Sequence, residues 1–407
     1  MMSNCNFSSN DRIDSIDVFR AVTMFFMIFV NDLWTLSNVP QWLVHVKMNV
    51  DGLGFADAIF PIFLFIVGLS IPLAINRSAE NKGGTVKIIK NIGVRTIALV
   101  VMGLFMVNHK YINAELVGMD KYLWKILMAV GIFLVWMHYR SITILSKNQV
   151  LFLQLVGIAL LAALAVTYQG GSTDNPHWVK THWWGILGVI GWAYLVSALL
   201  YLVIGPRITL LAACVILFHF FNVQEFGSFI EGTPALGEGR PAIDFIVSSS
   251  RYALVMSGVL ATVIYLRLNK NGQQQWFLYI LLALGAISLI YGFLLKPYWG
   301  GISKIRSTPS FTGICAGIGF IGLAVFYVVV DKLNFKKWAT PIAPAGTATL
   351  TCYLLPYIIY PVLALFALKL PEYLTTGYVG LMKSLFFAYL VIYLTGLLGK
   401  INIKLKV

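Results

Sequence analysis

The chain has 407 residues, of which 59% are hydrophobic and only 11% are charged, and its mean hydropathy is +0.81. This composition excludes an ordinary soluble enzyme and is typical of an integral membrane protein. The formal net charge of +14 does not indicate a nucleic-acid-binding protein, because the basic residues are spread over short segments between apolar runs.

Twelve apolar windows follow one another along the chain, and each approaches the roughly 20 residues that a helix needs to cross a bilayer. They cover residues 18–38, 54–76, 88–108, 122–139, 149–168, 185–204, 206–222, 246–267, 276–296, 310–331, 341–368 and 376–398. We therefore expect an all-α, polytopic transmembrane bundle of about twelve helices. Eleven spans remain open, because only Gly205 and Pro206 divide the sixth window from the seventh.

The distribution of Lys and Arg predicts how this bundle is oriented. With twelve spans and an inner amino terminus, Lys and Arg are more numerous in the inner segments, so we expect both termini in the cytoplasm. The chain then forms one transmembrane domain, residues 1–407, with a short cytoplasmic tail at residues 1–15 and an outer loop at residues 223–245. The first span lacks a cleavage site and is expected to be an uncleaved helix.

The four cysteines lie far apart and form no CxxC pair, so the sequence predicts no metal site. Polar residues in or beside the spans are the better functional candidates, because such residues are unfavourable in lipid. Arg20, Asn31 and Asp57 belong to this class. Each also has a structural explanation, respectively an ion pair with Asp17, a polar helix end and a helix cap.

The convergence of three polar residues at one membrane face favours a catalytic role over a structural one. The first span ends and the second begins at the same face, and the short loop between them carries His45, so Asn31, His45 and Asp57 can meet. A histidine can remove a proton from an attacking amine or hydroxyl, or can itself attack an activated acyl group. Asp57 would fix its tautomer, and Asn31 would donate to a developing oxyanion.

Other histidines compete for this role. His177 and His182 lie among tryptophans and are expected to anchor the chain at the interface. His109 ends the third span on the same face as His45 and is kept as a second candidate that borders the substrate.

Several segments together resemble the heparan-α-glucosaminide N-acetyltransferase family and its bacterial relatives. They are Arg12-Ile-Asp-Ser-Ile-Asp17-Val-Phe-Arg20-Ala21, Phe29-Val-Asn31, His45, the run from Phe55 to Gly68, Lys304-Ile-Arg306-Ser-Thr308-Pro309, and the stretch from Trp338 to Gly346. The resemblance implies a multi-pass protein, expected in a bacterial inner membrane, that transfers acetyl groups from cytoplasmic acetyl-CoA to an amino sugar across the membrane. It places the active-site histidine at His45 and its partner asparagine at Asn31. The chain departs from the family at Ala21 and Thr347, where the family has glycine and asparagine.

Acetyl-CoA is expected as the co-substrate, with no metal. Its phosphates would meet Arg20, since a guanidinium binds phosphate oxygens in a bidentate fashion, with further help from Lys332, Lys336 and Arg140. Lys304 and Arg306 would border an amino-sugar or glycan acceptor on the outer side. Membrane lipid is the surrounding partner, and a homodimer is left open.

Two alternatives share the same topology. A sugar or anion transporter would use Arg20, His45 and Asp57 to line a pathway, and would move solute without any dependence on coenzyme A. An O-acyltransferase would instead modify the hydroxyl groups of a cell-surface glycan.

Overall fold

The computed structural model describes residues 13–80, 84–142, 145–232 and 248–406 of the chain. The described part is nearly all helical, with one short antiparallel hairpin formed by β1 (Gly170–Ser172) and β2 (Asn175–His177). The α-helices are α1 (Asp14–Asp32), α2 (Phe55–Glu80), α3 (Thr85–Asn108), α4 (Ala114–Val117), α5 (Lys121–Trp136), α6 (Lys147–Val166), α7 (Gly185–Ile204), α8 (Ile208–Gly232), α10 (Ser249–Lys270), α11 (Gln275–Leu295), α12 (Pro309–Phe326), α13 (Ala343–Thr347), α14 (Thr349–Leu354), α15 (Pro356–Leu365) and α16 (Gly377–Lys400). Shorter elements are the 3-10 turns η1 (Leu33–Thr35), η2 (Tyr139–Ser141), η4 (Lys337–Ile342) and η5 (Glu372–Leu374), and the π-helical turn η3 (Tyr327–Lys332).

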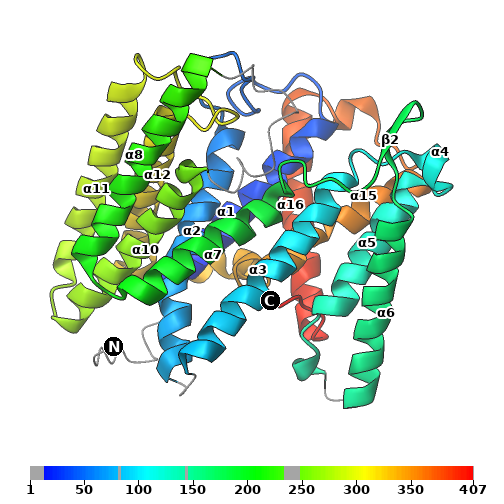
Figure 1. The fold of residues 1–407 in the computed structure, drawn as a ribbon, viewed down its shortest axis with the longest axis horizontal. Coiled ribbons are helices and arrows are strands. Elements are labelled where there is room, and N and C mark those ends of the chain that lie inside the picture. Colours follow the sequence, from blue (N-terminus) through cyan, green and yellow to red (C-terminus); the bar gives the residue numbers. More distant parts are fainter. Residues whose placement is uncertain (1–12, 81–83, 143–144, 233–247, 407) are drawn as a thin grey trace.

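The helices form two outer groups around a central one. In Figure 1, α8, α10, α11 and α12 lie on one side, α5 and α6 lie on the other, and α1, α2, α3, α7 and α16 run between them. Within the described residues, eight helices are long and apolar enough to cross a membrane, or nine if one bent pair counts as a span. The chain is therefore a polytopic helical membrane protein, and a helix occupies each of the twelve predicted windows.

Two sequence expectations differ from the structure in detail. The expected span at residues 341–368 is broken at Ala348 into two helical segments that meet at 76°. Ala348 itself has a non-helical backbone, with φ of −128° and ψ of 44°. Pro344 lies in the first turn of α13 and Pro356 begins α15, so the prolines flank the break without standing at it. Helix α8 continues to Gly232, so residues 223–232 of the expected outer loop are helical, while residues 233–245 fall outside the described part.

Close contacts between glycines hold several helix pairs together. A Cβ added to Gly68 of α2 would lie 1.9 Å from the Val255 carbonyl oxygen of α10, and one added to Gly258 would lie 2.0 Å from the Phe65 carbonyl oxygen. The two backbones therefore approach more closely than any larger residue allows, which is a common way to pack helices in lipid. Further glycine pairs join α3 to α7, α5 to α6, and α11 to α12, namely Gly103 with Gly188, Gly131 with Gly157, and Gly292 with Gly313.

A buried ionic network ties the first span to the last two. The carboxylate of Asp32 is 1% exposed and accepts hydrogen bonds from Tyr360 of α15 (2.5 Å) and from Ser384 of α16 (2.6 Å). The ammonium group of Lys383 lies 2.8 Å from the same carboxylate and donates to the Thr35 hydroxyl. Because an unpaired charge in this position would be very unfavourable, the network fixes α1 against α15 and α16.

Lys383→Met tests this network, because it leaves the Asp32 carboxylate buried without its counter-ion. We expect the free energy of unfolding in detergent to fall by about 3 kcal/mol. The exposed Lys369→Met is the matched control and should change it by less than about 0.5 kcal/mol. Equal values for the two lysine variants, measured by denaturant titration in micelles, would show that the network contributes nothing to stability.

Candidate active site

His45 lies in the connection between α1 and α2 and contacts the first turn of α2. Its Nδ1 donates a hydrogen bond to Asp57 Oδ1 at 2.7 Å, and its side chain is 54% exposed whereas that of Asp57 is 2% exposed. No described residue forms a hydrogen bond with His45 Nε2. With Nδ1 protonated, the Nε2 lone pair is therefore presented at the surface of the site.

The second oxygen of Asp57 holds the His45 connection in place. Asp57 Oδ2 accepts from the backbone N–H groups of Val46 at 3.0 Å and of Gly54 at 3.2 Å. The backbone of Gly54 also passes close to Val44, because a Cβ at Gly54 would lie 2.0 Å from the Val44 carbonyl oxygen. One carboxylate thus orients the imidazole and the loop that carries it.

Lys304 is the third charged group at this site, and it comes from the connection between α11 and α12. Its Nζ lies 3.3 Å from His45 Nδ1 and 3.7 Å from Asp57 Oδ1. Burial lowers the pKa of Lys304, and the negative charge of Asp57 opposes that shift. Thr308, which caps α12 and accepts from the Ser303 N–H at 3.1 Å, fixes the local turn.

A second ion pair joins the two connections. Asp51 accepts a hydrogen bond from the backbone N–H of Ile302 at 2.8 Å and lies 3.2 Å from the ammonium group of Lys296. The Ile302 hydrogen bond and Lys296 lower the pKa of Asp51, although partial burial acts against them. Arg306 donates to the Gly300 carbonyl oxygen at 3.2 Å and so stabilises the same turn.

Two other sequence candidates lie apart from this cluster. Asn31 is exposed and forms no hydrogen bond with any described residue, whereas its neighbour Asp32 is the buried group of the network above. His109 Nδ1 lies 2.5 Å from the Met106 carbonyl oxygen, and its ring packs edge-on against Tyr357. Burial, with help from Lys125, lowers the pKa of His109 to about 3, so its imidazole is neutral at physiological pH.

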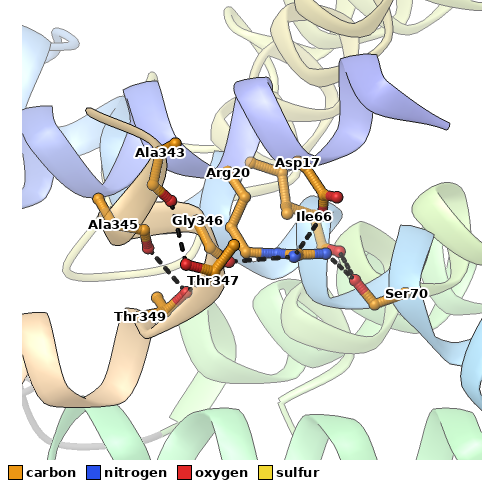
Figure 2. A network of polar contacts seen from close by, with 9 residues as sticks. All are labelled: Asp17, Arg20, Ile66, Ser70, Ala343, Ala345, Gly346, Thr347 and Thr349. Atoms are coloured by element: carbon orange, nitrogen blue, oxygen red, sulfur yellow. Dashed lines mark hydrogen bonds and ion pairs between the residues drawn. The ribbon is translucent and has the colours of Figure 1, made fainter. Parts of the chain in front are cut away.

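Arg20 occupies the other half of α1, where it borders a cavity of about 330 Å³. Figure 2 shows its guanidinium between three partners: Asp17 Oδ1 at 3.0 Å, the Gly346 carbonyl oxygen at 3.3 Å and Ser70 Oγ at 2.7 Å. Gly346 lies just before the break between α13 and α14 and approaches α1 closely, since a Cβ there would lie 2.7 Å from the Asp17 carbonyl oxygen. The broken span therefore supplies a backbone acceptor to Arg20.

Arg95 of α3 lines the same cavity and was not among the residues selected from the sequence. Its guanidinium lies 4.7 Å from the centre of the Tyr194 ring, and its Nε is buried with no hydrogen-bond partner among the described residues. Its position within an apolar span is the signal that marks it, by the same rule that selects Arg20. Lys406 also lines the cavity, so three cations border it.

The remaining basic candidates surround this region. Lys332 and Lys336 line a polar cavity of about 600 Å³ at the start of α1 and the end of η3, and Lys336 pairs with Asp14 at 2.8 Å. A third cavity, of about 430 Å³, shares Lys336 with it and shares Thr347 with the Arg20 cavity. Arg140 is exposed. Partial burial lowers the pKa of His138, and the positive charges of Lys406, Lys404 and Arg140 add to that shift. The second and third cavities thus both include Asp14 at the start of α1, and the third adjoins the Arg20 cavity at Thr347.

The arrangement of the His45 cluster is suitable for proton transfer or nucleophilic attack at Nε2, because the Asp57 carboxylate accepts the hydrogen bond from Nδ1. Among the described residues, no group of three or more His, Cys, Asp or Glu side chains is placed to hold a metal ion.

Fold and site together define a polytopic membrane protein with an ionisable cluster at one end of its second span. Residues 12–124 match the family described as heparan-alpha-glucosaminide N-acetyltransferase, catalytic. Two proteins named heparan-alpha-glucosaminide N-acetyltransferase are similar to the chain: the human one is 32% identical over 101 residues, and the mouse one is 32% identical over 105 residues. This amino-terminal segment is therefore similar to the catalytic part of that family, in agreement with the resemblance seen in the sequence.

The similarity is confined to part of each protein. It covers 25% and 26% of this chain, and only 14% and 15% of the human and mouse relatives. The family match contains Arg20, His45, Asp57 and Arg95 but ends long before Lys304. The ionisable cluster thus joins the matched segment to a part of the chain outside the match.

Gly54→Ala tests how the His45 connection is held. The new methyl group would collide with the Val44 carbonyl oxygen, so we expect the hydrogen bonds from Val46 and Gly54 to Asp57 to weaken. Amide hydrogen exchange across residues 43–57, followed by mass spectrometry, should accelerate about tenfold or more. The control Gly52→Ala meets only ordinary contacts, at 3.7 Å from Val46, and should exchange as the parent protein does. Identical exchange in both variants would contradict this description.

Proposed function

We propose that this protein is a transmembrane acetyltransferase that moves an acetyl group from cytoplasmic acetyl-CoA to an amino-sugar acceptor at the outer face, through His45. The observation that carries the proposal is the placement of two complementary sites on one helix. Asp57, beside His45, and Ser70, beside Arg20, are both on α2 and are separated by 13 residues, or about 20 Å of helix. An extended phosphopantetheine arm can span such a separation.

The Arg20 cavity fits the donor in charge and in polarity. Arg20, Arg95 and Lys406 supply positive charge at its border, as a pyrophosphate requires. Toward the His45 end its lining becomes apolar, with Met24 and Met27 from α1 and Phe63 from α2, which suits the uncharged arm. The adjoining cavities that contain Lys332 and Lys336 extend the route to the Asp14 end, where the nucleotide would enter.

At the other end of α2, His45 and Asp57 would perform the transfer. Asp57 holds the Nδ1 proton, so Nε2 is available to attack the thioester carbonyl carbon, with the thiolate of coenzyme A as the leaving group. The acceptor amine then attacks the acetyl-imidazole and loses its proton. In the alternative mechanism, Nε2 only removes a proton from the amine as that amine attacks the thioester directly. An acetylated His45 trapped in the absence of acceptor would establish the covalent route.

The proposal keeps the predicted orientation, with both termini in the cytoplasm and His45 outside, and a bacterial inner membrane as the location. Arg140 would add positive charge near Lys404 and Lys406. Arg306 would border the acceptor, and Asn31 stays a predicted oxyanion donor that would have to move to act on His45. Nothing in the cluster restricts the acceptor to an amine, so hydroxyl-bearing glycans are the comparison substrates.

His45→Ala tests the proposal directly. The side chain is half exposed, so the fold should persist, while acetyl transfer from labelled acetyl-CoA to glucosamine should fall to background. Binding of coenzyme A, measured by calorimetry, should remain within about twofold of the parent protein, because Arg20 and Arg95 are untouched. His177→Ala, which lies in the β1–β2 hairpin, is the matched control and should keep full activity. Wild-type transfer by the His45 variant would overturn the proposal, and solute flux without coenzyme A dependence would favour a transporter.

Arg95→Met tests the donor cavity. It removes a cation but keeps an apolar side chain of similar length against Tyr194. Because a hydrogen bond to a charged group contributes about 1.5–3 kcal/mol, the Kd of coenzyme A should rise about 10- to 100-fold. Arg95→Lys should recover part of the loss. The control Arg267→Met changes an exposed arginine at the end of α10 and should leave the Kd unchanged. An unaltered Kd in Arg95→Met would remove this residue from the donor site.

A further inference from the structure

Lys304 is in direct contact with the His45 imidazole and the Asp57 carboxylate. Its ammonium nitrogen is 3.3 Å from His45 Nδ1 and 3.7 Å from Asp57 Oδ1, and its side chain is only 27% exposed. Since Nδ1 already donates its proton to Asp57, the lysine cannot also donate to that nitrogen. Its effect on the imidazole is therefore electrostatic.

From this geometry we propose that Lys304 is a positioning residue that keeps His45 in its neutral form. Asp57 alone would favour a second proton on the imidazole, because a carboxylate in contact with a histidine stabilises the imidazolium. A cation in contact with both groups opposes that second proton and leaves the Nε2 lone pair free to react. The inference rests on the proposed function of His45 as the reacting group.

The other charged groups around the imidazole are already paired or solvated. Asp51 in the same connection pairs with Lys296, and Arg306 donates to the Gly300 carbonyl oxygen. Lys47 is exposed, so water screens its charge. The only titratable group that α12 adds near Asp57 and Lys304, within the described chain, is the buried thiol of Cys315. Lys304 is therefore the cation with direct access to His45 and Asp57.

Partial burial of Lys304 strengthens this interaction. In a poorly hydrated position the attraction and repulsion between charges a few ångströms apart are larger than in water. Burial also lowers the pKa of Lys304, and Asp57 limits that change. The Asp57 carboxylate, 3.7 Å from the lysine nitrogen, favours the ammonium form on which the effect on His45 depends.

The test is the pH dependence of His45 modification by diethyl pyrocarbonate, which reacts with the neutral imidazole and is followed at His45 by mass spectrometry. In Lys304→Met the midpoint of this reaction should move to higher pH by about 1 unit, because the imidazole gains its second proton more readily. Lys304→Arg retains a cation and should keep the midpoint near that of the parent protein. Lys47→Met is the matched control, since it removes a nearby but exposed lysine, and it should shift the midpoint by less than about 0.3 unit.

The same variants separate this inference from the proposed function. If Lys304→Met leaves the midpoint unchanged, or if Lys47→Met moves it equally, the inference is wrong whatever the protein catalyses. If the midpoint moves as expected but the parent protein transfers no acetyl group, the proposed function fails while the charge relationship stands. If the inference and the proposed function are both right, the acidic limb of the pH–rate profile for acetyl transfer should move with the midpoint of modification. The KM for acetyl-CoA should stay the same.

Discussion

A charged side chain that is shielded from water needs partners, and in this protein those partners come from distant parts of the chain. Asp57 binds His45, the backbone of its own connection and Lys304, while Asp32 binds Tyr360, Lys383 and Ser384. Each carboxylate therefore joins segments whose contact hydropathy alone does not predict. At Asp57, the pairing that stabilises the buried charge also brings His45 and Lys304 together in the candidate active site.

The second span is the element around which the proposed reaction is organised. One of its ends carries Asp57, and Ser70, farther along it, contacts Arg20, so one continuous helix sets the distance between imidazole and guanidinium. The break at Ala348 adds a carbonyl oxygen for Arg20 beside the cavity. Irregular backbone is tolerated at membrane depth where it lines a cavity, and here it does so.

Much of the helical framework could be predicted from the sequence, because a bilayer sets a minimum length for an apolar helix and the windows reflect it. The break at Ala348 could not, since the apolar window continues through Pro344 and Pro356 and says nothing about the angle between the halves. The contact between His45 and Asp57 follows from the short connection that separates them. Lys304 comes from a connection some 250 residues later, and only the packing of α12 against α2 brings it there.

Two further differences show where single-residue inference fails. Asn31 and Asp32 are neighbours, but successive helical residues point about 100° apart, so one faces outward and the other is buried. Sequence alone does not set that rotation when both sides of a span are apolar. Arg95 is a different case. It is an ionisable residue within an apolar span, so the rule that selects Arg20 also selects Arg95, but no recognisable motif surrounds it in the sequence.

The network around Asp32 also bears on how the protein is made. Translation produces Asp32 in the first span and Lys383 in the last, so nearly the whole polypeptide is synthesised before the acid meets its counter-ion. During that interval the nascent first helix ends in an acidic group that lacks its ammonium partner. The contacts of Asp32 with Lys383 and Ser384 can therefore form only after α16 has been made, so the final packing of the first helix is a late step in assembly.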